Sequence, residues 1–382
     1  MKITIVQGAF LPVPPLMGGA VEKIWFALGQ EFVRRGHEVV HISRRCMGLP
    51  REETIEGVRH IRVPGFDTPT SLALLKGLDL LYSLRALRVL PEADILVTNT
   101  FWLPFFVRSK RYGKLYVHAA RYPKGQMRFY AHADRLQTVS HPIREAIERE
   151  VPQLADKVRC ISNPLPGEVP SLLLERATNN GGEKRILYVG RVHPEKGIAL
   201  LLDAMMLIPA EQLAGWKLVV VGPAEAKYGG GGEAYLADLK RRSEKISDKI
   251  VWTGAIFDTD CLNEYYRSAS LFVYPSLAEK GETFGLAPLE AMAQGCPALV
   301  SNLDCFRDFI VEDVNGFVFD HRSANPAMTL AAKLQMLMGA QERLAAAAVY
   351  AHQKAGEFSL GCIAGQYLED FQSLLVGRDS KV

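Results

Sequence analysis

The chain has 382 residues, 48% of them hydrophobic and 23% charged, which is the composition of an ordinary globular protein. A chain of this length favours two domains over a single core. No apolar run reaches the length of a transmembrane helix, and the six cysteines are scattered without a C-x-x-C pair, as expected for reduced thiols of a cytosolic protein.

The charges are distributed unevenly along the chain. Residues 1–163 hold 24 Lys and Arg against 15 Asp and Glu, whereas the remainder holds 21 against 27. A basic N-terminal half would attract an anionic acceptor or a membrane surface. Uneven surface charge without a partner explains the same counts, and the sequence leaves both interpretations open.

In the first half, short apolar runs alternate with amphipathic segments of helical length, the pattern of a doubly wound parallel sheet. The chain begins directly with a strand-like run, so we expect no signal peptide. Helices are predicted at Ala20–Arg35 and Ser140–Glu150, the second with Ser140 as its N-cap. Strands are predicted at Ile3–Val6, Glu38–Ser43, Asp94–Thr98, Lys114–His118, Leu136–Val139 and Val158–Ile161.

Residues 164–183 carry three prolines and an Asn-Asn-Gly-Gly run, and predict an interdomain linker. The alternating pattern then restarts. Two successive α/β units predict a ligand cleft between them, beside the carboxyl ends of the strands. Strands of the second unit are predicted at Arg185–Val189, Lys217–Val221, Ile250–Trp252, Leu271–Tyr274, Ala298–Ser301 and Phe317–Phe319.

Two carboxylates flank the start of a predicted helix that runs from Leu286. Glu282 lies in the loop before this helix, and Glu290 lies about one turn inside it. The free N–H groups of Phe284, Gly285 and Leu286 would form an anion site at the helix N-terminus, where Gly285 lets a ligand approach the backbone. This arrangement suits a nucleotide-sugar, with Glu282 toward the transferred sugar and Glu290 toward the ribose.

The segment Glu282–Pro297 resembles the signature of retaining GT-B glycosyltransferases of family 4, also called glycosyl transferases group 1. The loop Gly190–Gly197 resembles the Gly-Arg…Lys-Gly loop of that family, and Gly18-Gly19 resembles its N-terminal glycine pair. All three motifs occur in the expected order, so the resemblance covers nearly the whole chain.

The resemblance implies an α/β fold of GT-B type, with two Rossmann-like doubly wound parallel-sheet domains and an interdomain cleft. Residues 1–163 would form the acceptor-side domain, and residues 184–360 the nucleotide-sugar donor domain. A crossing helix at residues 361–375 would pack back on the first domain.

The resemblance also implies roles for the basic loop. Arg191 and Lys196 would bind both phosphates of the leaving nucleoside diphosphate and replace a metal ion. A solvated basic loop is the alternative. Gly190 and Gly222 are assigned to the donor site as well, and the Lys227–Glu233 stretch is predicted to be a mobile loop over the nucleotide.

In the first domain, Gly18 and Gly19 would bring helix amides to the diphosphate, unless the pair serves only a steric purpose. His118 matches the position of the family's histidine that faces the donor sugar. Arg121 and Lys124 would contact an anionic acceptor, or they are simply surface residues.

Three other features have two interpretations each. Asp258-Thr259-Asp260 resembles the D-x-D metal motif of GT-A enzymes, but a helix N-cap at Thr259 or Asp260 explains it better, so no metal site is predicted. The helix Leu72–Leu90 either lies on a membrane or packs on the sheet, and we favour packing. The run Phe101–Phe106 either stacks on sugars or lipid or belongs to the core, which we favour.

The sequence therefore predicts a metal-independent, retaining glycosyltransferase that moves a hexose-type sugar from a UDP- or GDP-sugar to an acceptor hydroxyl. Cell-surface polysaccharide or glycoconjugate synthesis is the expected context, with a saccharide, lipid-linked or small-molecule acceptor. No cofactor and no nucleic-acid partner are expected, and the protein would be cytoplasmic or peripheral to the inner face of the membrane. The alternatives are an epimerase-like GT-B enzyme and a non-catalytic nucleotide-sugar-binding assembly protein.

Overall fold

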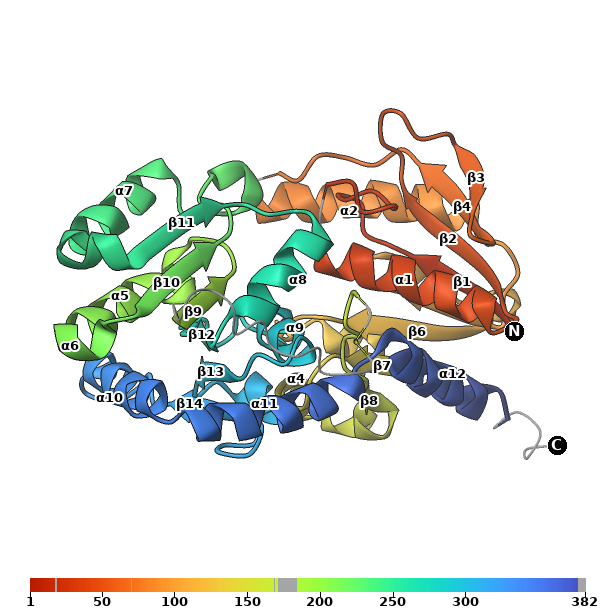
Figure 1. Cartoon of the computed structure of the whole chain (residues 1–382). Helices are drawn as coiled ribbons and strands as arrows, with labels where there is room; N and C mark the ends of the chain where they lie inside the picture. Colours follow the sequence, from red (N-terminus) through yellow and green to blue (C-terminus); the bar gives the residue numbers. More distant parts are fainter. Residues whose placement is uncertain (18, 70, 168, 171–183, 377–382) are drawn as a thin grey trace. The chain divides into compact units, whose positions relative to one another are not determined.

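The computed structural model describes residues 1–17, 19–69, 71–167, 169–170 and 184–376. The chain divides into two compact units, Met1–Pro166 with Leu360–Val382 and Gly167–Ser359. Each unit is an α/β fold built on its own sheet (Figure 1). Most of the predicted linker 164–183 lies outside the described residues.

The first unit contains an eight-stranded sheet in the order β3-β4-β2-β1-β5-β6-β7-β8. All neighbours pair in parallel except the edge strand β3, which is antiparallel to β4. The strand order reverses between β1 and β5, the position where doubly wound sheets bind ligands. The strands are β1 (Lys2–Val6), β2 (Glu38–Arg44), β3 (Glu52–Ile55), β4 (Val58–Val63), β5 (Ile95–Thr98), β6 (Lys114–Ala119), β7 (Arg135–Thr138) and β8 (Val158–Cys160).

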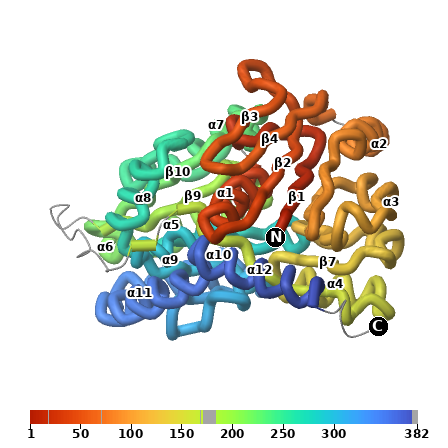
Figure 2. Tube along the Cα trace, turned by 90° about the vertical axis from the view of Figure 1, so that its right-hand side faces the viewer, coloured from red at the N-terminus to blue at the C-terminus, as the bar shows by residue number. Residues whose placement is uncertain are grey.

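The C-terminal helix belongs to this first unit. Asp370 of this helix accepts a hydrogen bond from the Tyr116 hydroxyl at 2.9 Å and forms a 2.7 Å ion pair with Arg135. Helices α2 and α3 pack side by side at one edge of the unit (Figure 2). The helices are α1 (Ala20–Arg34), α2 (Leu72–Leu87), α3 (Leu103–Phe106), α4 (His141–Glu150) and α12 (Leu360–Val376), with 3-10 turns η1 (Lys110–Tyr112), η2 (Met127–Tyr130) and η3 (Pro152–Lys157).

The second unit contains a six-stranded, fully parallel sheet in the order β11-β10-β9-β12-β13-β14. Its central strands are buried along their length, as a sheet covered by helices on both faces requires. The strands are β9 (Lys184–Val189), β10 (Trp216–Val221), β11 (Ile250–Gly254), β12 (Leu271–Tyr274), β13 (Ala298–Ser301) and β14 (Gly316–Phe319).

The helices of the second unit follow its strands in regular alternation. Among them, α5 packs against α10, and α9 packs against α11. The helices are α5 (Ile198–Met206), α6 (Ala210–Leu213), α7 (Glu233–Arg242), α8 (Thr259–Ser268), α9 (Leu286–Ala293), α10 (Pro326–Gly339) and α11 (Gln341–Gly356), with 3-10 turns η4 (Pro194–Lys196), η5 (Ala226–Tyr228), η6 (Glu244–Lys249) and η7 (Asp304–Asp308).

The β3–β4 hairpin was not predicted from the sequence. It turns through Glu56 and Gly57, both with positive φ. Two consecutive residues of this kind make the tight turn that matches the twist of a hairpin. Charged residues, Glu52 and Glu53 in β3 and Arg59 and Arg62 in β4, interrupt the apolar pattern that revealed the other strands.

The structure bears on four further local predictions. Asp258, not Thr259 or Asp260, is the N-cap of α8, and its carboxylate accepts a 2.8 Å hydrogen bond from the Cys261 amide. Ser140 precedes α4 as predicted, but its hydroxyl makes no capping bond. The helix predicted at Leu72–Leu90 contacts strand β4 of the sheet, as we favoured, but its buried stripe contains Asp79 and Ser83 while several of its leucines are exposed. Of the Phe101–Phe106 run, only Leu103 and Pro104 are fully buried.

Candidate active site

Backbone contacts at the carboxyl ends of β9 and β10 explain two of the predicted glycines. A Cβ atom on Gly222 would lie 1.9 Å from the carbonyl oxygen of Gly190. The two strand ends therefore meet with no room for a side chain between them. This contact requires a glycine at position 222, and a Cβ on Gly190 would lie 2.9 Å from the Tyr188 hydroxyl, whether or not either glycine also touches a donor.

Gly197 brings the basic loop against the segment that follows β12. Its φ of +71° is left-handed, and a Cβ there would lie 1.9 Å from the Pro275 carbonyl oxygen. The preceding turn η4 is therefore pressed onto the Pro275 backbone. This places the Lys196 side chain in a buried position, where its ammonium donates to Glu282 Oε2 at 2.7 Å.

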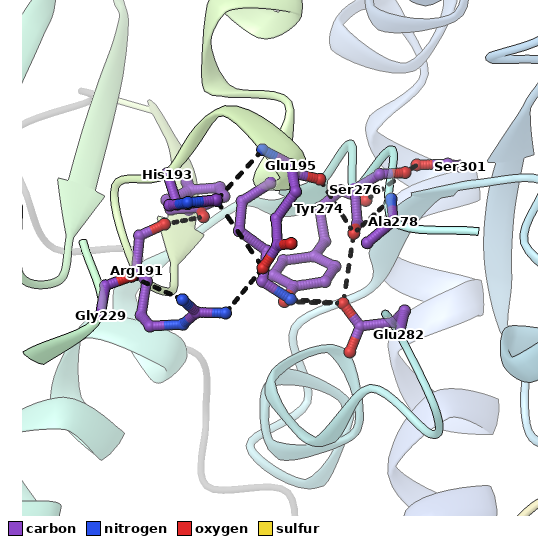
Figure 3. Close-up of polar contacts among 11 residues, drawn as sticks. Arg191, His193, Glu195, Gly229, Tyr274, Ser276, Ala278, Glu282 and Ser301 are labelled. Carbon is purple, nitrogen blue, oxygen red and sulfur yellow. Dashed lines mark hydrogen bonds and ion pairs between the residues drawn. The ribbon is translucent and has the colours of Figure 1, made fainter. Parts of the chain in front are cut away.

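The two oxygens of the Glu282 carboxylate differ in their partners. Oε2 accepts hydrogen bonds from Lys196, from the Tyr274 hydroxyl at 3.1 Å and from Ser276 Oγ at 3.2 Å (Figure 3). Burial, reinforced by the nearby charge of Glu282, holds the pKa of Tyr274 well above its usual value, so this phenol stays a donor. Among the described residues Oε1 has no partner, so it is the oxygen left for a ligand hydroxyl.

The Arg191 guanidinium is half exposed and is held by two oxygens. It donates to Glu195 Oε1 at 2.7 Å and to the Gly229 carbonyl at 2.5 Å (Figure 3). The glycine loop is also fixed by the Gly231 amide, which donates to the Val192 carbonyl at 2.8 Å. The loop at Lys227–Glu233, which the sequence predicts to be mobile, is thus hydrogen-bonded to Arg191 and Val192 in the structure.

The N-terminus of α9 presents backbone amides as predicted. Among the described residues, the N–H groups of Phe284, Gly285 and Leu286 donate to no protein acceptor. Gly285 has a φ of +86°, and a Cβ there would lie 2.4 Å from the Phe306 ring. This glycine is therefore needed to pack the loop on Phe306, a role in addition to the close ligand approach that the sequence suggested.

Glu290 lies one turn inside α9 and is oriented by a tyrosine of α8. The buried Tyr266 hydroxyl donates to Glu290 Oε2 at 2.9 Å. Burial and the Glu290 charge hold the pKa of Tyr266 well above its usual value. The phenol thus remains protonated and fixes one oxygen of the carboxylate.

In the first unit, a glutamine determines the protonation of His118 near the end of β6. Gln137 Nε2 donates to the carbonyls of Thr138 and Ile161, at 2.7 and 2.8 Å, so Oε1 must be the acceptor of its 2.5 Å contact with His118 Nδ1. His118 is buried, and burial lowers its pKa to about 4. The ring is therefore neutral, with its proton on Nδ1 and an unpartnered acceptor at Nε2.

Other neutral polar groups that have no partner within the described part of the chain lie at the same edge of the sheet. They follow the carboxyl ends of β1, β5 and β7, on either side of the point where strand order reverses. Buried polar atoms are normally paired, so a group of orphans at a sheet edge indicates a place for a polar ligand. These atoms are Gln7 Oε1, Asn99 Oδ1, Thr138 Oγ1 and Ser140 Oγ.

Comparison with known proteins identifies the family. Residues 173–354 match the model of glycosyl transferases group 1, and residues 17–166 match that of glycosyltransferase family 4. The chain is 30% identical over 352 residues to an uncharacterized glycosyltransferase of Methanocaldococcus jannaschii, covering 83% of this chain and 84% of that protein. The chain belongs to the family 4 glycosyltransferases.

Further relatives agree with this assignment. A lipopolysaccharide core biosynthesis mannosyltransferase of Rhizobium meliloti is 33% identical over 124 residues, about a third of each chain (32% of both). The structure of a sucrose-phosphate synthase from Thermosynechococcus elongatus superposes with a TM-score of 0.81 over 99% of this chain and 100% of that one, at 20% identity. The Anabaena protein HepE, solved in complex with UDP, gives 0.70 over 98% and 100% at 18% identity.

These structures have the GT-B fold, as the sequence predicted. No helix among the described residues of this glycosyltransferase has the length and apolar character needed to cross a membrane.

The predicted glycine pair of the glycosyltransferase is only partly described. Gly18 lies outside the described residues, and Gly19 is the N-cap of α1 with a φ of +96°. A Cβ on Gly19 would lie 2.2 Å from the carboxylate of Glu22. Burial raises the pKa of Glu22, and the Arg121 charge opposes that rise. An acidic side chain thus already occupies the helix end that we assigned to the diphosphate.

The structure brings Arg191, Lys196 and Glu282 into one network and leaves Arg121 and Lys124 exposed on the loop after β6. Sequence reasoning missed the side chains that orient the two carboxylates, Arg191 and His118. Position in the chain offered a signal for some of them, because side chains at the ends of central strands point into the ligand edge of such sheets. The missed residues are Tyr274, Ser276, Tyr266, Glu195 and Gln137.

Proposed function

We propose that this glycosyltransferase moves a hexose-type sugar from a nucleoside diphosphate sugar, UDP- or GDP-linked, to an acceptor hydroxyl with retention of configuration. The observation that carries the proposal is the buried Lys196–Glu282 pair, with one carboxylate oxygen left unpartnered, in the unit that also presents the free amides of α9. The UDP complex of HepE supports a nucleotide donor for this fold.

The leaving diphosphate would be stabilised by charge that is already in position. Lys196 gives one of its three N–H bonds to Glu282 and keeps two for a phosphate oxygen. Arg191 would give up its hydrogen bond to Glu195 or to the Gly229 carbonyl and bind the second phosphate instead. The amides of Phe284–Leu286 would complete the anion site. With two cations in place, no metal ion and no other cofactor is needed.

The sugar and the ribose would be bound by the two carboxylates. Glu282 Oε1 would accept hydrogen bonds from sugar hydroxyls, while Oε2 stays fixed by its three donors. Glu290, oriented by Tyr266, would accept from the ribose hydroxyls. His118 Nε2, the unpaired acceptor of a neutral ring, would face the sugar from the first unit.

The chemical step would be a same-face displacement. The bond between the anomeric carbon and the diphosphate oxygen breaks, the acceptor oxygen bonds to that carbon, and the acceptor proton passes to the departing phosphate oxygen. No enzymatic nucleophile is required, because the leaving group itself takes the proton.

We further propose an acceptor of a cell-surface polysaccharide or glycoconjugate, by analogy with the lipopolysaccharide mannosyltransferase of R. meliloti. Arg121 and Lys124 are exposed after β6 and would contact an anionic group of that acceptor. The protein would act in the cytoplasm, with its basic first unit peripheral to the inner face of a membrane.

A thermal-shift screen of nucleotides and nucleotide-sugars tests the proposal first. A cognate donor at 100 times its Kd should add about 2.7 kcal/mol of stability. The donor identified in this way is then incubated with acceptors, and the anomeric configuration of the product is read by NMR. Release of a free epimer or a sugar phosphate would contradict transfer, and nucleotide binding without turnover would favour an assembly protein.

A further inference from the structure

Helix α2 buries polar side chains and exposes leucines, the opposite of an ordinary surface helix. Its fully buried residues are Asp79, Tyr82, Ser83 and Ala86, which form one stripe at helical spacing. Four leucines of this helix are instead between 36% and 73% exposed, namely Leu74, Leu81 and Leu84 on the opposite side and Leu72 in the first turn.

Aromatic residues extend this apolar face beyond α2. Trp102 and Phe105 at α3 contact each other with ring centroids 5.3 Å apart, and Phe105 contacts Phe129 of η2 at 5.7 Å. Phe129 is 45% exposed, and α3 packs against both α2 and η2 (Figure 2). Together with the four leucines, these three aromatic residues define a leucine–aromatic surface.

The buried carboxylate of Asp79 attaches α2 to the segment that carries the aromatic residues. Asp79 accepts hydrogen bonds from the amides of Phe101 and Trp102 at 3.0 and 3.1 Å, and Trp102 Nε1 donates to the Lys76 carbonyl at 2.8 Å. The helix and the aromatic segment are therefore held together by polar contacts on the inner side. The leucines contribute little to that attachment.

Positive charge predominates in the chain segments that carry this surface, although Asp134 pairs with Lys114 and Glu150 accepts hydrogen bonds from the amides of Gly125 and Met127. Residues 71–90, 101–114 and 121–131 hold ten Lys and Arg and a single acid, the buried Asp79. Lys76 lies over the Phe101 ring at 4.9 Å, and Arg128 over the Phe129 ring at the same distance. The cations thus border the apolar side chains directly.

We propose that the leucine–aromatic surface docks on an anionic lipid bilayer, with α2 lying in the membrane interface. Apolar side chains flanked by Lys and Arg are the combination that enters the headgroup boundary, and aromatic rings with a polar atom prefer the same depth. The basic border matches phosphate headgroups in charge. This inference specifies the membrane contact proposed above, but docking itself requires no glycosyl transfer.

Vesicle flotation of the full chain tests the proposal. The protein is mixed with vesicles of phosphatidylcholine alone and with vesicles that contain about 30% phosphatidylglycerol. We expect binding to the anionic vesicles, weakened by salt, and about tenfold less binding by a Leu81→Glu/Leu84→Glu variant, because both leucines would enter the interface. Lys76→Glu/Arg88→Glu should lower binding to anionic vesicles specifically.

Val349→Glu/Tyr350→Glu is the matched control, because these residues are 51% and 53% exposed on α11 of the other unit. It should bind vesicles like the unaltered protein. Thermal melting confirms that every variant is folded. Failure of the unaltered protein to float with anionic vesicles, or equal binding by Leu81→Glu/Leu84→Glu, would overturn the proposal.

A dimer in solution that depends on Leu81 and Leu84, without vesicle binding, would also overturn it and assign the surface to a second copy of the chain. Because flotation needs no donor and no acceptor, its outcome is separate from that of the transfer assay.

Discussion

The ligand edges of the two sheets are built from different chemistry. In the second unit the edge holds ionised groups that are already paired, Lys196 with Glu282 and Arg191 with Glu195. In the first unit the edge holds neutral polar groups, among them His118 Nε2, that have no partner among the described residues.

This difference indicates two ways of preparing a site. Burying a charge without a partner costs much free energy, so the ions of the charged edge are paired with one another. When a donor binds, its phosphate would either join such a pair or replace the carboxylate in it. Leaving a neutral acceptor unpaired costs less free energy than leaving a charge unpaired. The first edge can therefore keep its acceptors free until a ligand hydroxyl binds. We expect mutations at the charged edge to have the larger effects.

The largest effect is expected from removing the buried cation. Lys196→Ala should lower kcat by about 10²–10³, the scale for loss of one preorganised charge stabiliser. Arg191→Ala should have an effect in the same range but at its lower end, because this side chain is half exposed. Steady-state kinetics with the cognate donor provide the measurement.

Lys333→Ala is the control for that pair, since Lys333 of α10 is paired with Glu312 and has no role in the proposed site. It should leave kcat unchanged. Turnover close to that of the unaltered enzyme in both Lys196→Ala and Arg191→Ala would place the diphosphate elsewhere.

Mutations of the two carboxylates of the charged edge should have different effects, because one is proposed to bind the transferred sugar and the other the ribose. Glu282→Gln should impair transfer while leaving affinity for the bare nucleoside diphosphate nearly intact, because Oε1 is proposed to bind the sugar. Glu290→Ala should weaken diphosphate binding by about 1.5–3 kcal/mol, the scale of a hydrogen bond to a charged group. Calorimetric titration of both variants makes the comparison, and the opposite pattern would exchange the two assignments.

The neutral edge is tested through Gln137, which positions His118. In the unaltered enzyme the pKa of His118 is lowered to about 4, so kcat/KM should show no ionisation of this ring near pH 6.5. Gln137→Glu places a negative charge beside Nδ1 and should raise that pKa. Protonation then removes the Nε2 acceptor. The activity of the variant should therefore fall about tenfold below the raised pKa of His118 and recover at higher pH.

A merely structural role of Gln137 would lower activity equally at every pH. Gln137→Leu serves as the comparison, because it breaks the same hydrogen bonds without adding charge. Its loss of activity should not depend on pH in the range where Gln137→Glu changes.

The sequence was sufficient to predict the strands of both parallel sheets and to recognise the three family motifs in their order. All twelve predicted strands are present, because a strand buried on both faces leaves a continuous apolar run, as in Leu271–Tyr274. The β3–β4 hairpin escaped prediction because the edge strand β3 exposes alternate side chains and because charged residues interrupt the apolar pattern of both strands.

Partners of the site residues were less accessible to sequence reasoning. The pairing of Lys196 with Glu282 joins residues 86 positions apart, and it depends on how Gly197 packs against Pro275. The tautomer of His118 depends on two carbonyls that only the folded chain brings to Gln137. Residue types at fixed spacing identify candidates for catalysis, whereas the state of each candidate follows from tertiary contacts.

The smallest expected effect is that of a chelator. If Arg191 and Lys196 neutralise the leaving diphosphate, donor turnover in EDTA should equal turnover without it. The only D-x-D sequence supports this expectation, because Asp258 uses its carboxylate to cap α8 at the Cys261 amide. Activity that is lost in EDTA and restored by manganese would contradict the prediction and return Asp258 and Asp260 to consideration as ligands. In that case the charged edge would need a divalent ion in addition to its two cations, and the contrast between the two edges would be larger than proposed.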